Sequence, residues 1–509
     1  MPSNKYKPHD GEGDTVRSQW SSKMDYLFSL SGMTMGTWNI FMFPHLFFRN
    51  GGVAYLIPLF TMVVLVGIPL FMMELSMAQF SSTTILNFYE ICPALRGIGF
   101  TAVLAMTIYL MTYTVLLSYP LIFLWESFRS ELPWSLCSNA FNSLLCITME
   151  EYENSTADYS DDYNYFALTE EKNKTIPSSE EFFHQNVLEL SPGILELGGL
   201  VTSVSLANLA VFVLVFLIIF KGIKVMGKAT WFTTLFPILI LLVLMIRTLT
   251  LPGALIGVKG YLIPNFYYIL NHYVWLDATV QAIFFLGTGM GSNFFLGSFN
   301  KYRNNTFLDV LVVPIVNFVV AFVFGIVFFS LMGFLANVSG KESWEMYRSE
   351  GFAMLYISVP DALAAMPSAN FWSAAFYVMI FLMGIDNWFI LVQTLVTTLC
   401  DYYPLLNTRR ITVTLVACVA LYFAGLLICS RAGMYWLMLL DHYILNFTSL
   451  FIAAMEMVVL SYIYGTGWAM RDIQVMTGKT MGRFVWFTWM YSCPLLLMAA
   501  FIFYLSLTI

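Results

Sequence analysis

Long stretches of consecutive apolar residues follow one another along most of this chain, and they set its architecture. A helix needs about 20 apolar residues to cross the hydrocarbon core of a membrane. Runs of this length without strict alternation predict helices, because only helices and closed barrels satisfy every backbone group in lipid. We count eleven such runs, at residues 25–48, 53–80, 98–128, 200–220, 230–250, 272–298, 308–336, 371–400, 411–428, 435–464 and 484–508.

The composition supports a polytopic membrane protein and excludes several other classes. Of the 509 residues, 59% are hydrophobic and only 11% are charged, whereas soluble proteins carry about 25% charged residues. The net charge of -7 and the lack of a basic tract argue against a nucleic-acid partner. No CxxC…CxxC or HExxH zinc pattern occurs. We therefore expect a protein that works in the lipid membrane and is not an enzyme.

Lysines and arginines indicate how the helices are oriented. With the N-terminal segment 1–24 in the cytosol, fifteen of the 24 basic residues fall in short cytosolic segments, as the positive-inside rule requires. The polar insert 131–197 then lies outside the cell, and its two glycosylation sequons, at Asn154 and Asn173, agree with that side. A second outer segment, 338–370, is long enough for a lid, although a plain connector is the alternative.

Two of the eleven runs are interrupted near their centres. The first contains Gly32, Gly36 and Pro44, and the sixth contains three glycines within residues 287–291. Interrupted spans at corresponding positions are typical of secondary transporters, where half-helix ends and freed carbonyls bind substrate and cations. The alternative is that these glycines only permit close packing of helices.

Six acidic residues lie within or at the ends of the apolar runs. A charged side chain costs about 2.5–3.5 kcal/mol at the centre of a spanning helix, and almost no lysine or arginine occurs in mid-span to pair with these acids. A proton or a bound monovalent cation would neutralise them, so they are candidate cation ligands. An inert protonated or hydrogen-bonding role is the alternative for each one. The six are Glu74, Asp277, Asp386, Asp401, Asp441 and Glu456.

Several motifs occur in the order expected for one known family. They include Arg17-Ser-Gln-Trp20, the stretch 43–52 that ends in Asn-Gly-Gly, Gly67-Ile-Pro-Leu-Phe-Met-Met-Glu74-Leu, the spacing from Gly227 to Pro237, and Gly384-Ile-Asp386-Asn387. With these residues the chain resembles the neurotransmitter:sodium symporter family, the sodium- and chloride-dependent carriers of amino acids and monoamines. The resemblance covers almost the whole chain, from Arg17 to about Ile509.

The resemblance implies an all-α membrane protein with a LeuT-type five-plus-five inverted repeat. Ten helices within residues 25–464 would form the transport core, with the first and sixth helices broken. Residues 465–509 would add a cytosolic loop and an eleventh helix. Because the family has twelve helices, we expect either a C-terminus outside the cell or a short isoform.

The resemblance also implies two sodium sites, and the second is complete in this sequence. Its ligands would be the main-chain carbonyls of Gly32, Met35 and Met383 together with the side chains of Asp386 and Asn387. These are hard oxygen ligands with one carboxylate among them. We therefore expect sodium to bind there.

The first sodium site departs from the family pattern. Asn39 and Asn317 match its two amide ligands, and Thr34 would add a main-chain carbonyl. Phe285, however, stands where the family has a serine or threonine ligand, and a phenyl ring cannot coordinate sodium. We therefore expect this site to be incomplete.

The chloride site departs further. Gln281 and Asn317 match the family, but Leu59, Phe285 and Ala321 occupy the other three ligand positions. We therefore expect sodium, and not chloride, to serve as the coupling ion.

The implied substrate pocket is lined by bulky side chains, so we expect it to be small or closed, and it offers no acidic group for an amine. Gly36 stands where monoamine carriers have aspartate, and Tyr113 matches the tyrosine that binds a substrate carboxylate, which favours a small neutral amino acid. Trp38 replaces a glycine, although its side chain could equally point into lipid or protein packing. The pocket candidates are Gly36, Thr37, Trp38, Tyr109, Tyr113, Phe284, Phe285, Met290 and Trp388.

The gates implied by the resemblance are only partly retained. Arg17 and Asp401 would form the cytosolic pair, with Phe299 in place of its supporting tyrosine. Phe284 would be the aromatic lid and Asp441 the outer acid, but Met42 replaces the arginine that would pair with it.

Cys137 and Cys146 match the outer-loop disulfide of the family. Two reduced thiols are the alternative, although thiols outside the cell are usually oxidised.

Two functions remain open from the sequence. The first is a sodium-coupled symporter of a small neutral amino acid, or a related small solute, that works by alternating access at the plasma membrane. The second is a transport-deficient family member that acts as a partner or sensor protein, motivated by Trp38, Met42, Leu59 and Phe285. The sequence leaves open whether the chain forms an oligomer or binds an accessory subunit.

Overall fold

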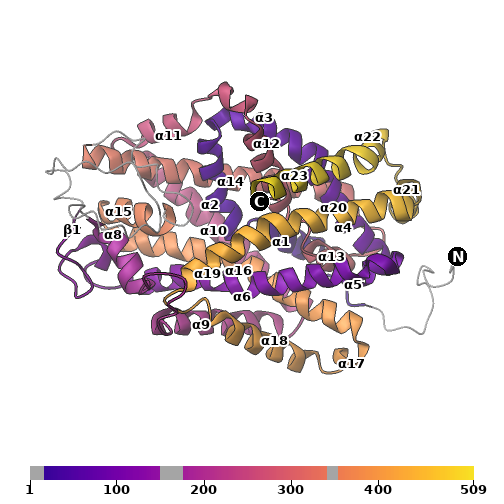
Figure 1. The fold of residues 1–509 in the computed structure, drawn as a ribbon, viewed down its shortest axis with the longest axis horizontal. Coiled ribbons are helices and arrows are strands. Elements are labelled where there is room, and N and C mark those ends of the chain that lie inside the picture. The colour runs from indigo at the N-terminus through magenta and orange to yellow at the C-terminus, as the bar shows by residue number, and fades with distance from the viewer. Residues whose placement is uncertain (1–16, 149–175, 341–353, 509) are drawn as a thin grey trace.

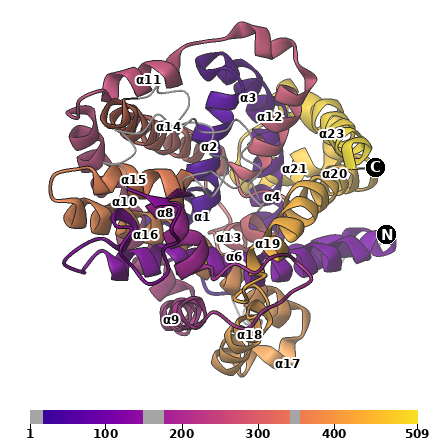
Figure 2. The same cartoon turned by 60° about the vertical axis from the view of Figure 1, so that its left-hand side comes forward.

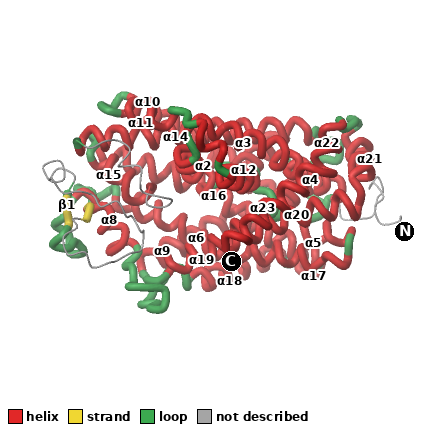
Figure 3. The backbone as a smooth tube through the Cα atoms, turned by 45° about the horizontal axis from the view of Figure 1, so that its top comes forward, coloured by secondary structure: helices red, strands yellow, loops and turns green. Residues whose placement is uncertain are grey.

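The computed structural model describes residues 17–148, 176–340 and 354–508, and these residues are mostly helical. The helices run side by side along the molecule, with most loops gathered near its two ends (Figure 1 and Figure 3). The strands described are β1 (Cys146–Ile147) and β2 (Ile176–Pro177), which pair in parallel. An all-α membrane protein is therefore confirmed. Asn154 and Asn173 lie outside the described residues, so their glycosylation stays a prediction.

The helices include long spanning helices, the halves of interrupted spans and short connecting helices. In chain order they are α1 (Lys23–Thr34), α2 (Thr37–Arg49), α3 (Leu56–Met62), α4 (Ile68–Ser81), α5 (Ile85–Phe88), α6 (Arg96–Glu126), α8 (Ser178–Glu181), α9 (Thr202–Ile219), α10 (Ile223–Leu249), α11 (Ala254–Leu262), α12 (His272–Phe284), α13 (Ser292–Ser298), α14 (Thr306–Ser339), α15 (Val359–Ala364), α16 (Ala369–Tyr402), α17 (Pro404–Asn407), α18 (Arg410–Gly425), α19 (Gly433–Leu440), α20 (Ser449–Val458), α21 (Thr466–Thr477), α22 (Arg483–Phe487) and α23 (Cys493–Thr508).

Within the described residues, 8 helical segments are long and apolar enough to cross a membrane. They overlap eight of the eleven predicted runs. Of the other three, 25–48 is divided between α1 and α2, 272–298 is divided between α12 and α13, and 411–428 corresponds to the 16-residue α18. The two interruptions fall in the runs where the glycines predicted them, whereas the total of eleven crossings stays a prediction.

Helical structure extends further than predicted after residue 464. Gly465 adopts a φ of 97°, a left-handed value that glycine reaches without a steric penalty. Helix α21 begins at the next residue and ends at Thr477, and α22 begins at Arg483. The loop expected from residue 465 is therefore confined largely to residues 478–482.

The outer helices differ from the central ones in how they are buried. On α9 the buried residues Val204, Asn208, Val211, Val215 and Ile219 recur every three or four positions, which is the pattern of a helix with one face on the core. The remaining face of α9 is apolar and exposed, as expected for contact with lipid tails. In contrast, α16 is buried along most of its length. Helices α1, α13 and α16 lie toward the middle of the molecule, with other helices around them, in both views (Figure 1 and Figure 2).

Candidate ion and substrate site

The break in the first span frees main-chain carbonyls at the centre of the protein. Helix α1 begins with a capping box between Ser22 and Asp25 and ends at Thr34, and α2 begins two residues after Met35. Gly36 takes a non-helical ψ of 154° between the two helices. The last carbonyls of a helix have no intrahelical partner, so the Thr34 carbonyl accepts hydrogen bonds from side chains instead.

The break in the sixth span has the same effect. Helix α12 ends at Phe284 and α13 begins at Ser292. Gly289 and Gly291 adopt φ values of 78° and 79°, which L-residues with a side chain rarely reach. The glycines therefore turn the chain out of the helix and leave carbonyl groups at the end of α12 without helical partners.

Three of these carbonyls converge on two buried amides. The Asn39 amide nitrogen donates to the carbonyls of Thr34 (2.7 Å) and Phe284 (2.8 Å). The Asn317 amide nitrogen donates to the carbonyls of Thr34 (3.1 Å) and Phe285 (2.6 Å). The amide oxygens of Asn39 and Asn317 are buried and have no hydrogen-bond partner among the described residues. Five oxygen atoms from both broken helices and α14 thus belong to one cluster.

Phe285 contributes to this cluster through its backbone and not through its ring. Its carbonyl accepts the bond from Asn317, while its ring packs 6.5 Å from the ring of Phe43, which in turn contacts Phe318 edge-on at 5.9 Å. The sequence reasoning considered only the missing hydroxyl at this position. It missed the carbonyls of Phe284 and Phe285, for which the sequence offered only the general signal of a helix break.

Asp386 on α16 accepts hydrogen bonds on both of its carboxylate oxygens. The hydroxyls of Thr233 and Thr234 on α10 donate to Oδ1 and Oδ2, the latter at 2.7 Å. Helix α1 approaches closely, since a Cβ atom on Gly32 would lie 2.6 Å from Oδ2. The two threonines were not predicted, and their only sequence signal was their position as adjacent polar residues in an apolar run. A carboxylate has about four lone-pair sites, so two hydroxyls leave acceptor capacity for a further ligand.

The neighbouring Asn387 connects the same two helices. Its amide nitrogen donates to the Met33 carbonyl at 2.9 Å, and its amide oxygen is buried without a partner among the described residues. Met35 caps the end of α1, and Met383 lies one turn before Asp386 on α16; both are buried. Because α1 and α16 pack together, the residues predicted for the second sodium site are brought into one region.

Aromatic side chains occupy the region predicted as the substrate pocket. The rings of Tyr109 and Tyr113 on α6 stack at 4.6 Å, and Trp388 on α16 stacks on Tyr109 at 5.1 Å and on Tyr113 at 6.5 Å. Met290 is buried and Phe284 is half-buried. The side chains of Thr37 and Trp38 lie outside the described part of the chain, so the two orientations considered for Trp38 stay open.

Gly36 faces Asn387 across the break. A Cβ atom at this position would lie 2.5 Å from the Asn387 amide nitrogen, which is shorter than a non-bonded contact allows. A larger residue at position 36 would therefore require Asn387 or the backbone to shift.

The predicted chloride positions are buried and mostly apolar. Leu59 and Ala321 are almost fully buried and carry no hydroxyl, and the Phe285 ring packs on Phe43. Gln281 is buried, and its amide nitrogen has no partner among the described residues. The Asn317 amide nitrogen is engaged with carbonyls.

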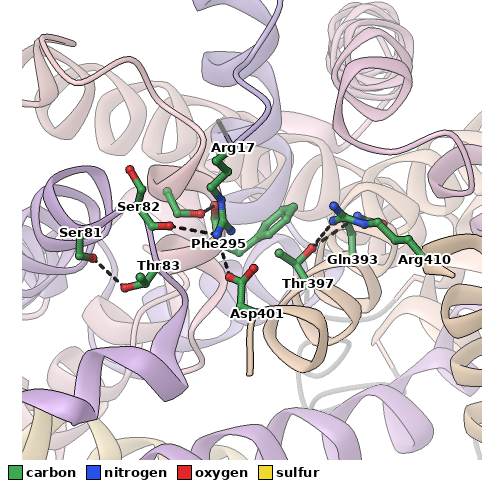
Figure 4. Close-up of polar contacts among 10 residues, drawn as sticks. Arg17, Ser81, Ser82, Thr83, Phe295, Gln393, Thr397, Asp401 and Arg410 are labelled. Atoms are coloured by element: carbon green, nitrogen blue, oxygen red, sulfur yellow. Dashed lines mark hydrogen bonds and ion pairs between the residues drawn. The ribbon is translucent and has the colours of Figure 1, made fainter. Parts of the chain in front are cut away.

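Arg17 and Asp401 form the predicted contact at the end of the molecule where the described chain begins. Arg17 Nη1 lies 2.8 Å from Asp401 Oδ2 and also donates to the Ser82 carbonyl at 3.0 Å (Figure 4). The guanidinium group sits 4.2 Å from the centre of the Phe299 ring, so phenylalanine retains a cation–π contact without a hydroxyl. In the same view Arg410 donates to Thr397 at 2.6 Å (Figure 4).

The charged pair predicted for the outer gate is incomplete. Asp441 follows α19, and its Oδ1 atom is buried with no hydrogen-bond partner among the described residues. Met42 is half-buried and offers no charge. The disulfide between Cys137 and Cys146 is present, with their Cα atoms 5.7 Å apart, so the predicted pairing is confirmed and the alternative of reduced thiols is not.

Two acids of the apolar runs have arginine partners. Asp401 pairs with Arg17, as the resemblance implied, and Asp277 pairs with Arg49 at 2.8 Å. The second pair was not predicted, because Arg49 is the last residue of α2 and counting charges in mid-span does not find it.

The fold defines the class of protein. An all-helical membrane protein whose first and sixth spans are interrupted, with carbonyls from both breaks bound by the same amides, has the architecture of a secondary transporter. The model of the Sodium:neurotransmitter symporter family matches residues 17–508. The chain belongs to this family, whose members are transporters and not enzymes.

Several transporters are similar over nearly the whole chain. The sodium- and chloride-dependent neutral and basic amino acid transporter B(0+) of Homo sapiens is 34% identical over 97% of this chain and 80% of its own length. The sodium- and chloride-dependent GABA transporter 2 of Rattus norvegicus is 34% identical over 97% and 80%. The sodium- and chloride-dependent taurine transporter of Canis lupus familiaris is 35% identical over 96% and 78%.

Proposed function

We propose that this protein is a symporter that couples the inward movement of sodium to the transport of a small neutral amino acid across the plasma membrane, with its N-terminus in the cytosol. The observation that carries the proposal is the meeting of the Thr34, Phe284 and Phe285 carbonyls with the Asn39 and Asn317 amides. Helix C-termini carry partial negative charge, so the two breaks favour a cation between them.

The first sodium site would form by a local change in the amides. A turn of Asn39 and Asn317 by 180° about the bond to the amide group exchanges nitrogen for oxygen. Their oxygens, which have no hydrogen-bond partner among the described residues, would then face the three carbonyls and a sodium ion among them. The carbonyl of Phe285 would supply an oxygen even though its ring cannot.

The second sodium site would join α1 to α16. Asp386 would provide the negative charge, and Asn387 its amide oxygen, which has no hydrogen-bond partner among the described residues. The carbonyls of Gly32, Met35 and Met383 would complete the ligands. Sodium there would hold α1 against α16 while the outer side is open. Its release to the cytosol would free the two helices to separate, which is the differential binding that coupling requires.

The features of the pocket favour a small amino acid whose side chain carries no charge. Gly36 supplies no acidic side chain, and a larger residue there would require Asn387 or the backbone to shift, so a substrate amine would meet main-chain carbonyls. The stack of Tyr109, Tyr113 and Trp388 limits the length of the substrate. Relatives are named for amino acids, GABA and taurine, which all combine an amine with an acidic group. A compact amino acid best fits both the limited length of the pocket and this combination of an amine with an acidic group.

The gates and the ions complete the proposal. Arg17, Asp401 and Phe299 would close the cytosolic side, and Asp441 with Phe284 would line the outer side. Although the relatives are named as chloride-dependent, we propose that this chain works without chloride, because Leu59, Phe285 and Ala321 offer no hydroxyl side chain.

A radiolabelled amino-acid panel tests the proposal in oocytes, with external sodium compared with choline. We expect sodium-dependent uptake of at least one small neutral amino acid, and loss of this uptake in Asp386→Ala. Glu131→Gln, at an exposed outer acid, is the matched control and should leave uptake unchanged.

The double variant Trp38→Gly, Phe285→Ser addresses the alternative, a transport-deficient protein that acts as a partner or sensor. If neither the wild type nor this variant takes up any amino acid while both reach the cell surface normally, the symporter proposal is wrong.

A further inference from the structure

Two carboxyl groups meet inside the protein, apart from the residues assigned to sodium. Glu74 on α4 and Glu456 on α20 are both 0% exposed and face each other within hydrogen-bonding reach. Glu74 Oε1 accepts the Gly289 backbone N–H at 2.7 Å, and Oε2 accepts the Asn293 amide at 2.8 Å. The oxygens of Glu456 accept no hydrogen bond from the N–H and O–H groups of the described residues.

The hydroxyl of Tyr89 is a third buried group near the two carboxyl groups. The hydroxyl of Tyr89 is fully buried, has no hydrogen-bond partner in the described part of the chain, and lies within electrostatic reach of both carboxyl groups. The buried thiol of Cys493 on α23 faces Glu74 as well. No lysine, arginine or histidine of the described residues forms an ion pair with either glutamate. No cation of the described residues therefore cancels two negative charges at this place.

Two ionised carboxylates cannot remain side by side in a medium of low dielectric constant, because their repulsion adds to the cost of burying each charge. A single proton removes both problems, since it neutralises one group and lets that group donate a hydrogen bond to the other. Glu74 already has the two N–H donors that stabilise a carboxylate, whereas Glu456 has none. We propose that Glu74 and Glu456 form a proton-binding site, with the proton held by Glu456 and shared with Glu74.

The position of this site links the proton to the break in the sixth span. Glu74 binds Gly289 in the linker between α12 and α13 and Asn293 on α13, and α4 packs along α13. Glu456 belongs to a different group of helices, since α20 packs on α6 and α23. Loss of the proton would leave two carboxylates, and their repulsion would push α4 and the linker away from α20. Alkaline pH would therefore loosen this contact, whichever substrate or cation the transporter carries.

Infrared difference spectroscopy of the purified full-length protein tests for the proton directly. At neutral pH a protonated carboxyl group has a C=O stretching band separate from that of carboxylates. We expect one such band to be lost in Glu456→Gln and retained in Asp361→Asn, which removes a different buried acid. Identical carboxyl bands in the wild type and Glu456→Gln would overturn the proposal.

Thermal stability at alkaline pH gives an independent measurement. In sodium-free choline buffer, with Asp361→Asn as the background, we expect the melting temperature to fall by a few degrees between pH 7 and pH 10. Adding Glu456→Gln should abolish most of this fall, because a neutral amide replaces the protonated acid. If that variant does not fold, Glu74→Gln serves instead and should reduce the fall, because it removes the repulsion between the two carboxylates. An unchanged fall in the folded variant would refute the proton site.

Discussion

The Oδ2 atom of Asp386 on α16 accepts a 2.7 Å hydrogen bond from the hydroxyl of Thr234 on α10. A hydroxyl stabilises a carboxylate but carries no charge, so this contact leaves the negative charge of Asp386 uncompensated. Gly32 on α1 packs against the same oxygen atom. The three helices thus meet at one buried acid, and the charge can be balanced by a proton or by a cation, which our first prediction distinguishes.

Asp386→Ala should remove the part of the sodium stabilisation that the second site supplies. A ligand present at 100 times its dissociation constant stabilises the native state by about 2.7 kcal/mol, and the variant removes the only carboxylate proposed for the second site. The measurement is the melting temperature in sodium and in choline. Thr234→Val is the control, because it removes a hydroxyl and leaves the carboxylate. Sodium stabilisation as large in Asp386→Ala as in the wild type would show that this acid does not bind the ion.

Replacing external chloride with gluconate should change sodium-dependent uptake less than twofold. Leu59, Phe285 and Ala321 are buried and provide no hydroxyl side chain to an anion. Uptake is measured at constant sodium concentration with and without chloride. The variant Ala321→Ser gives a useful comparison, since its hydroxyl restores one hydrogen-bond donor for an anion. A strict chloride requirement in the wild type would contradict the prediction.

Arg17→Ala should expose the cytosolic side of the transporter. The Arg17–Asp401 pair is partly buried, with both side chains 20% exposed, and its loss removes the contacts of Arg17 with Ser82 and Phe299 as well. Cys400 is buried next to Asp401. We expect its labelling by a membrane-permeant maleimide to increase several-fold, in a background that keeps only Cys400 and the disulfide.

Arg409→Ala is the matched control for this labelling, because Arg409 is an exposed arginine that follows Asp401 closely in the sequence. Equal labelling rates in Arg17→Ala and Arg409→Ala would mean that the Arg17–Asp401 pair does not restrict access.

Asp361→Asn should flatten the pH dependence of stability. Burial in the outer segment raises the pKa of the Asp361 carboxyl from 3.8 to about 8. Between these values the folded protein binds the proton and the unfolded chain does not, so stability falls as pH rises from about 4 to about 8 and then levels off. The slope for one such group is about 1.4 kcal/mol per pH unit.

The melting temperature between pH 5 and pH 9 measures this effect. We expect Asp361→Asn to lack the fall between pH 5 and pH 7 and to be more stable than the wild type at pH 9. Glu131→Gln, at an exposed acid, should keep the slope of the wild type. A variant of Asp361 that retains the full slope would show that another group is responsible.

The sequence alone determined the class of the protein and the positions of its irregularities. Apolar length fixes where helices can cross a membrane, and glycines fix where they break, because both are local properties of the chain. The breaks at Gly36 and within residues 287–291 followed from glycines that can be read directly. The Cys137–Cys146 disulfide and the Arg17–Asp401 contact followed from the resemblance of the sequence motifs to the family.

The tertiary structure decided which groups complete the site. The carbonyls of Phe284 and Phe285 belong to the backbone, which is the same at every residue, so no side chain announces that they are free. Thr234 meets Asp386, and Glu74 meets Glu456, only because helices far apart in the sequence pack together. In lipid a buried polar group must find a partner within the protein, and the packing of helices determines which partner that is.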